Sequence, residues 1–184
     1  MIRAVTPAPL VIGVAEAKQQ LRIDHDDEDA LLEGQLAAAQ EWVEMFTSQV
    51  LTPRTLLFSA AGFPQLPEMI VLARAPVTGV TAISFTTAEG EEIDLLPGNW
   101  RWSEDAPELV RPAFGSPWPS AAAEAGSVRL RVSAGYDEGL APRGLVTAVL
   151  MLAGHFFANR EGSGAVPEQV KDLCRPFRRF SLGL

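Results

Sequence analysis

A cluster of carboxylates near the N-terminus is the first group of side chains that could bind a metal ion or take part in catalysis. Residues 24–29 read Asp-His-Asp-Asp-Glu-Asp, the densest acidic run in the chain. A calcium loop places oxygen ligands at alternate positions, followed by a glycine and then a distal glutamate. Asp29 occupies the position where that glycine is required. The cluster therefore predicts no metal site but a helix start, with Asp27 as the N-cap and acidic neighbours at the positive helix end.

Two further groups are candidates for catalysis. His155 lies within an apolar helical run, which favours a structural histidine, and a small hydrolase using His155 and Glu161 is the less favoured alternative. Cys174 stands near Lys171 and Arg175, whose charges could lower the pKa of the thiol. A packed thiol on a short helix is the preferred interpretation. We therefore expect no catalytic residue, cofactor or intrachain disulfide.

Tryptophan side chains suggest a second possible function. Trp100 and Trp102 alternate on one expected strand, and together with Trp118 they could form a platform for a sugar or a base. Packing in a core or a turn is the commoner use of tryptophan. A β-sandwich module that binds a sugar or a peptide is thus an alternative function.

The C-terminal segment, residues 175–184, differs from the rest of this acidic chain because it is both basic and apolar. It follows a flexible Gly-Ser-Gly sequence at residues 162–164. Arginine and aromatic side chains are enriched among the residues that dominate binding at protein interfaces. We interpret the segment as a partner-docking peptide, and the alternative is that it folds back onto its own helices. The proposed docking residues are Arg175, Phe177, Arg178, Arg179, Phe180, Leu182 and Leu184.

Helices are expected at both ends of the chain. Residues 14–21 and 166–174 indicate short helices, and a longer helix follows Pro142. A long helix over residues 28–46 is predicted by apolar side chains at intervals of three and four, which should face the core. These are Leu32, Leu36, Ala39, Val43 and Phe46. Its other face should be exposed, with Glu33, Gln40, Glu41 and Glu44.

The middle of the chain indicates short antiparallel strands. Expected strands cover residues 54–59, 69–73, 80–86, 92–95, 100–103, 109–111 and 127–134. The fold class is therefore α+β: a helical bundle formed by N- and C-terminal helices with an inserted antiparallel β-rich region. We divide the chain into an N-terminal helical part (1–50), a β-rich insertion (51–134), C-terminal helices completing the helical part (135–174) and the docking segment (175–184).

Composition and charge narrow the classes of function. The 184 residues are 47% hydrophobic and 21% charged, which is typical of a globular protein with a substantial core. A net charge of −8 argues against a general nucleic-acid coat, although an acidic wall could let DNA slide past without sticking. No signal peptide is expected at the N-terminus, and the apolar helix after Pro142 is too short and too closely flanked by charges to span a membrane.

Several sequence patterns, taken together, resemble the head–tail connector (adaptor) family of tailed phages. They include Ala-Glu-Ala-Lys at residues 15–18, Leu-Arg-Ile-Asp at 21–24 and Asp-Asp-Glu-Asp-Ala-Leu at 26–31. Ala-Ala-Ala-Gln-Glu-Trp-Val-Glu follows at 37–44, and Ala-Arg-Ala-Pro-Val at 73–77 with Val-Thr-Ala-Ile at 80–83. Gly135 and Tyr136, then Pro142, precede His-Phe-Phe-Ala-Asn-Arg-Glu at 155–161. The order and spacing of the whole set carry the resemblance, which covers nearly the whole chain.

The resemblance implies a structural protein of the longer connector form, which carries a β-rich insertion. Such proteins usually form a ring of twelve copies between the portal protein and a tail-side stopper or terminator protein, and DNA passes through the lumen without sequence-specific binding. The implied location is the head–tail interface of a virion or phage-like particle, assembled in the bacterial cytoplasm. The source could be a phage, a prophage or a gene transfer agent. In some relatives the C-terminal segment docks onto the portal, which implies the same role for residues 175–184.

Overall fold

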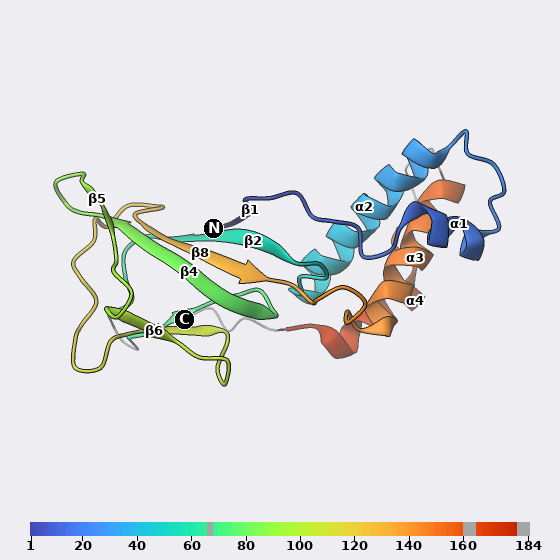
Figure 1. The fold of residues 1–184 in the computed structure, drawn as a ribbon. Coiled ribbons are helices and arrows are strands. Elements are labelled where there is room, and N and C mark those ends of the chain that lie inside the picture. Colours follow the sequence, from blue (N-terminus) through green and yellow to red (C-terminus); the bar gives the residue numbers. More distant parts are fainter. Residues whose placement is uncertain (66–67, 160–164, 180–184) are drawn as a thin grey trace. The chain divides into compact units, whose positions relative to one another are not determined.

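The computed structural model describes residues 1–65, 68–159 and 165–179. One short strand and two helices come first, seven strands follow in the middle, and helices end the described part of the chain (Figure 1). The order is β1 (Ile2–Ala4), α1 (Val14–Leu21), α2 (Asp29–Thr47), β2 (Arg54–Ala60), β3 (Ile70–Val71), β4 (Val77–Thr86), β5 (Glu92–Asp94), β6 (Trp100–Trp102), β7 (Leu109–Pro112), β8 (Val128–Ala134), α3 (Arg143–Ala158), α4 (Glu168–Cys174) and the 3₁₀ helix η1 (Arg175–Phe177). The chain divides into two compact units. Residues 1–8 and 53–135 form the β-rich unit, and residues 9–52 and 136–184 form the helical unit.

The core of the helical unit lies between α2 and α3. Both helices place apolar side chains toward it at intervals of three and four, which confirms the periodicity in the sequence. The fully buried apolar residues of the two helices are Leu32, Leu36, Ala39 and Val43 from α2 and Leu145, Ala148, Val149, Leu152 and Ala153 from α3. Val170 and Cys174 of α4 are also 0% exposed, so α4 is an integral part of this core.

Two glycines of α3 allow neighbouring segments to approach closely. A Cβ atom on Gly154 would lie 2.8 Å from the Leu21 Cδ2 atom at the end of α1. A Cβ atom on Gly144 would lie 3.1 Å from the Phe177 Cε2 atom of η1. Both positions therefore bring an apolar side chain against the backbone of α3, where a larger residue would need the neighbour to move.

A buried polar cluster at the C-terminal half of α2 corrects one prediction. Gln40 and Glu44 were expected on the exposed face, but they are 3% and 7% exposed. The Gln40 amide accepts a hydrogen bond from the Val11 backbone N–H at 2.8 Å and donates one to the Pro9 carbonyl at 3.0 Å. Glu44 accepts a hydrogen bond from the Leu51 N–H at 2.9 Å. Both side chains turn inward because they satisfy backbone groups of loops that lie against α2.

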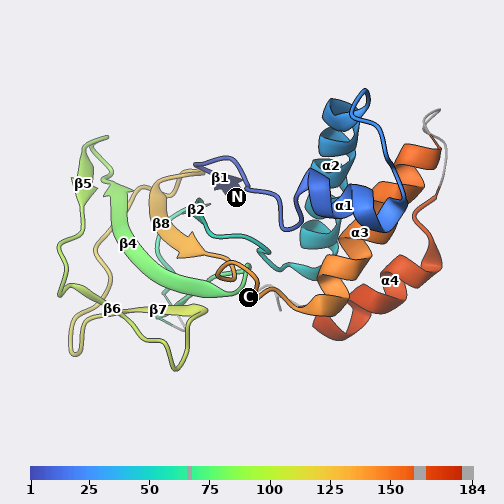
Figure 2. The same ribbon diagram turned by 45° about the vertical axis from the view of Figure 1, so that its right-hand side comes forward.

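The β-rich unit contains two antiparallel sheets. The larger has the strand order β1-β2-β8-β4-β5 and the smaller has the order β3-β7-β6. In Figure 2 the strands β6 and β7 lie along one side of the curved strand β4. Residues 2–4, which we assigned to the N-terminal helical part, instead pair with β2, so that Ile2 lies opposite Phe58 and Ala4 opposite Leu56. The short N-terminal strand had no clear signal because it is only three residues long.

Strand β8 occupies the centre of the larger sheet and pairs with both β2 and β4. Its Val128, Leu130 and Val132 are at most 1% exposed, whereas Arg129 and Arg131 alternate with them on the other face. This arrangement confirms the half-buried strand that the alternation predicts. The register of β4 against β8 shifts near Gly79 and again near Thr81, which marks irregular pairing beside regular strands.

Candidate docking sites

Helix α4 leads directly into the docking segment proposed from the sequence. Pro167 precedes the helix, and α4 continues into η1 without a break in the chain. Cys174, at the end of α4, is 0% exposed, and burial raises the pKa of its thiol to about 11. The charges of Lys171 and Arg175 therefore do not activate this thiol, and it packs as a small apolar group.

Residues 175–179, which we call the docking root, lie against the C-terminal end of α2. The Gln49 amide donates a hydrogen bond to the Phe177 carbonyl at 3.0 Å, and the Arg179 N–H donates one to the Thr47 carbonyl at 3.0 Å. The Arg178 guanidinium carbon lies 5.1 Å from the centre of the Phe46 ring. These contacts are what the alternative interpretation predicted for this half of the segment. The other proposed docking residues, Phe180, Leu182 and Leu184, lie outside the described residues.

Gln49 joins the docking root to the start of the C-terminal helical part. Its side-chain oxygen accepts a hydrogen bond from the Tyr136 hydroxyl at 3.1 Å, while its nitrogen binds the Phe177 carbonyl. Partial burial raises the pKa of the Tyr136 hydroxyl, and the positive charge of Arg179 opposes that shift. Arg175 makes ion pairs with Glu168 and Asp172 on the surface of α4, which contribute little to stability because they are exposed. The docking root is therefore held against the helical unit by backbone and side-chain hydrogen bonds.

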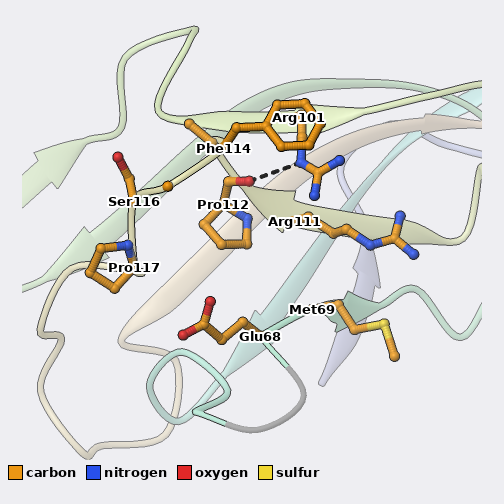
Figure 3. Close-up of a pocket in the computed structure, with 10 residues that line it drawn as sticks. Glu68, Met69, Arg101, Arg111, Pro112, Phe114, Ser116 and Pro117 are labelled. Carbon is orange, nitrogen blue, oxygen red and sulfur yellow. Dashed lines mark hydrogen bonds between the residues drawn. The ribbon is translucent and has the colours of Figure 1, made fainter.

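A second candidate site lies in the β-rich unit, beside the loop after β7. A hollow of about 540 Å³ is lined by residues of this loop, by β6 and β7, and by Glu68 and Met69. Figure 3 shows the Phe114 ring against the Arg101 guanidinium, and the distance from the guanidinium carbon to the ring centre is 3.8 Å. Phe114 is 84% exposed, an unusual position for a phenylalanine in a folded protein. Sequence reasoning missed this site, although Phe114 followed by Gly115 could have suggested an exposed turn.

Of the histidine and the glutamate considered for hydrolysis, the structure describes only the histidine. His155 is half-buried in α3, and its Nδ1 atom lies 3.3 Å from the Asn159 amide nitrogen. Its Nε2 atom is buried and has no hydrogen-bond partner among the described residues. Glu161 lies outside the described residues, so the pair remains an untested alternative. No group of three potential metal ligands occurs in the described part of the chain.

The tryptophan platform does not form in the structure. Trp118 is only 8% exposed and stacks on Phe63, with ring centres 4.8 Å apart. The Trp102 indole N–H donates a hydrogen bond to the Pro107 carbonyl at 2.8 Å, and Trp100 is half-buried on the same strand. Trp118 packs in the core of the β-rich unit, so the three rings do not offer one flat face to a ligand.

The acidic cluster at residues 24–29 forms ion pairs within the helical unit. Lys18 of α1 pairs with Asp26 and, at 2.7 Å, with Asp29 at the start of α2. These hydrogen bonds raise the pKa of Lys18, and its bond to Asp26 lowers the pKa of that carboxyl. The N-cap is Glu28 and not Asp27 as predicted, and no side chain caps the helix. Lys18 instead pairs with two carboxylates of the cluster, and these ion pairs join α1 to the start of α2.

Comparisons with known proteins agree with this architecture. The profile of the family described as phage gp6-like head-tail connector protein matches residues 12–92. A solved chain from the neck of an empty GTA particle, computed with C6 symmetry, is 30% identical with a TM-score of 0.79, and the match covers 100% of this chain and 98% of that one. The chain belongs to the phage head–tail connector family. None of the curated proteins compared with it matches.

Two other solved chains resemble the connector over the same extent, each with 100% of the connector and 98% of the other chain covered. One comes from the virion of a native gene transfer agent particle, with 29% identity and a TM-score of 0.81. The other comes from the neck of a native GTA particle computed with C12 symmetry, with 29% identity and a TM-score of 0.77. The α+β fold class is confirmed by these matches and by the structure.

Family membership decides the general role of the connector. It is a structural protein of the head–tail junction of a phage or phage-like particle, and it is not an enzyme. In the described part of the chain, no helix has both the length and the apolar character needed to cross a bilayer.

Proposed function

We propose that the connector assembles into a ring of twelve copies between the portal protein and a tail-side stopper or terminator protein of a gene transfer agent or related phage particle. The proposal rests chiefly on the full-length likeness to chains from GTA particles, one in a neck computed with C12 symmetry. DNA would pass through the ring without sequence-specific binding. A net charge of −8 supports this role because it disfavours tight attachment to phosphates.

Within this ring, residues 175–184 dock onto the portal protein. The docking root supports this proposal because contacts with Gln49, Thr47 and Phe46 hold the base of the segment against the helical unit. A peptide with a fixed base loses less conformational freedom on binding than one that is free at both ends. Phe180, Leu182 and Leu184 are the anchors we assign to the portal, and Arg175, Phe177, Arg178 and Arg179 form the base.

The test is a pull-down of the portal protein by the full-length chain and by a chain ending at Arg179. This truncation keeps α4 and the docking root, because Val170 and Cys174 belong to the core and earlier truncation would unfold the helical unit. We expect portal binding to fall at least tenfold while circular dichroism and the unfolding midpoint stay unchanged. A matched control replaces Leu140, an exposed apolar residue outside the docking segment, with serine. Unchanged portal binding by the truncated chain would refute the docking role.

The ring itself is tested separately by mass photometry of the full-length chain, alone and mixed with portal rings. Assembly into one species of twelve copies is the expected result, with or without the portal as a template. A chain that stays monomeric on portal rings, or that forms rings with another number of copies, would overturn the proposed ring of twelve. The measurement without portal, made at high protein concentration, tests the ring independently of the C-terminal anchors.

A further inference from the structure

We propose that the hollow beside Phe114 receives the β4–β5 hairpin of a neighbouring copy of the connector. The inference rests on the ring assembly proposed above and assigns one of its contacts to named residues of the β-rich unit. The receiving surface consists of Arg101, Arg111 and Phe114, and the entering surface consists of Glu89 and Glu91 of the hairpin.

The receiving surface has the residue types that dominate protein interfaces. Arginine, methionine and aromatic residues are enriched there, and exposed Phe114 stands beside Arg101, Arg111 and Met69. The Arg101 side chain is held in place by a hydrogen bond from its Nε atom to the Pro112 carbonyl at 3.1 Å and by stacking on Phe114. A guanidinium held in a fixed position can donate two hydrogen bonds to one carboxylate at low entropic cost.

The charges of this surface are not neutralised within the chain. In the parts that the structure describes, no carboxylate forms an ion pair with Arg101 or Arg111. In Figure 3 the Arg111 guanidinium points away from the Glu68 carboxylate on the opposite wall of the hollow. Two positive groups without partners beside an exposed aromatic ring favour an occupant that carries carboxylates next to apolar side chains.

The β4–β5 hairpin offers that chemistry. It is a defined turn, closed by a hydrogen bond from the Thr87 N–H to the Glu91 carbonyl at 2.8 Å. Glu89 and Glu91 are exposed and have no ion-pair partner among the described residues, whereas the next residue, Glu92, pairs with Arg129. Exposed apolar side chains follow close behind, Ile93 at 40% and Leu96 at 68%. The hairpin thus matches the two arginines and Phe114 in both charge and apolar character.

A second copy is the favoured occupant because the two surfaces are unlike and come from different sheets. The hollow is built on β6 and β7, and the hairpin joins β4 to β5 in the other sheet. A contact between two different surfaces of identical chains leaves one of each free, so it repeats from copy to copy until the ring closes. High local concentration of neighbouring copies in a ring also makes a modest contact effective.

The experiment uses charge reversal in the full-length chain, assembled alone and on portal rings. Arg111→Glu and Glu91→Arg should each weaken assembly at least tenfold, because each places like charges together. The double variant, R111E with E91R, should recover most of the loss. Glu124→Arg, at another exposed acidic position of the β-rich unit, is the matched control and should leave assembly unchanged. Circular dichroism verifies that each variant folds.

Cross-linking then locates the contact. Glu89→Cys and Ala113→Cys are placed in the same chain, and oxidation should produce a ladder of covalent oligomers that neither single variant gives. Buried Cys174, whose thiol pKa is raised to about 11, does not interfere.

Rings that form without the ladder and tolerate both reversals would overturn this contact and leave the ring proposal standing. If the unmodified chain forms no ring even on the portal, both fail. If Arg111→Glu weakens only portal binding, the hollow belongs to the portal and not to a second copy.

Discussion

The two units of the connector treat their polar side chains in opposite ways. Among the described residues, the buried polar side chains are Gln40, Glu44, Thr47, Gln49 and Thr52 in the helical unit and only Ser127 in the β-rich unit. The β-rich unit instead exposes Phe114 beside Arg101 and Arg111, which form no ion pair with any residue that the structure describes. In the helical unit the buried polar side chains hold loops against α2, whereas the polar and aromatic side chains of the hollow stay at the surface, where a contact with a second copy is proposed.

The largest expected effect comes from removing core volume in the helical unit. Leu36→Ala should lower the free energy of unfolding by about 2–5 kcal/mol, because Leu36 is 0% exposed and its loss leaves a cavity between α2 and α3. Denaturant unfolding followed by far-UV circular dichroism measures the change. Leu31→Ala on the same helix is the control, since Leu31 is 37% exposed and should cost much less. Equal losses from both variants would contradict the assigned core face.

The next effect tests the buried polar cluster against its counterpart in the β-rich unit. Glu44→Ala removes the acceptor of the Leu51 N–H and should cost about 1–3 kcal/mol, because a buried donor is left without a partner. Ser127→Ala removes the acceptor of the Gly62 N–H, a bond of 2.9 Å in the β-rich unit, where the donor is only partly buried. We expect the smaller loss there, measured by the same unfolding experiment. A larger loss of stability from Ser127→Ala than from Glu44→Ala would contradict this contrast between the two units.

The helices could be predicted from the sequence because a repeat of three and four residues directly reports which face is buried. That repeat identified Leu32, Leu36, Ala39 and Val43 correctly. It misplaced Gln40 and Glu44 because the periodicity of one helix does not reveal which loops will need hydrogen-bond partners. Those loops are distant in the sequence, as the bond between Val11 and Gln40 illustrates.

The β-rich unit was predictable in its strands but not in its sites. Alternation in residues 127–134 identified the central strand, since every second side chain is buried. The three residues of β1 carry no such pattern, and their pairing with β2 arises from tertiary contact. The hollow beside Phe114 joins Glu68 and Met69 to residues of β6, β7 and the following loop, which no local spacing could bring together. For the docking segment, composition suggested a role, but only the structure revealed where its root is held.

A smaller effect distinguishes two glycines of the helical unit. Gly34→Ala should raise the free energy of unfolding by about 0.5–1 kcal/mol, because a Cβ atom there meets nothing within 4 Å and alanine favours the helix. Gly154→Ala should show no such gain, since its Cβ atom would press on Leu21 at 2.8 Å. Thermal unfolding of the two variants, side by side, checks the prediction. A matching gain at Gly154 would mean that α1 does not pack closely on α3.

The smallest effect concerns the exposed ion pair of Lys18 with Asp26. The folded pKa of Asp26 is lowered from 3.8, so the stabilising contribution is present above that value and is lost as pH falls through the folded pKa. The folded pKa of Lys18 is raised from 10.5, so its contribution is present below that value and is lost as pH rises through the folded pKa. Lys18→Met should therefore lower the unfolding midpoint slightly at neutral pH, and the difference from wild type should vanish in acid. A difference that is independent of pH would assign the effect to packing.

The hydrogen bonds around Gln40 and Gln49 also matter for the evolution of the connector. Pro9, Thr52 and Tyr136 are the residues at which the chain enters or leaves the helical unit. Each is hydrogen-bonded to a side chain from the C-terminal half of α2 or from the turn after it. Hydrogen bonds within the helical unit thus hold the chain at each point where it passes to or from the β-rich unit. Such an arrangement tolerates the exchange of one inserted module for another, so a lineage could acquire, enlarge or discard the β-rich part while the helices continue to fold as before.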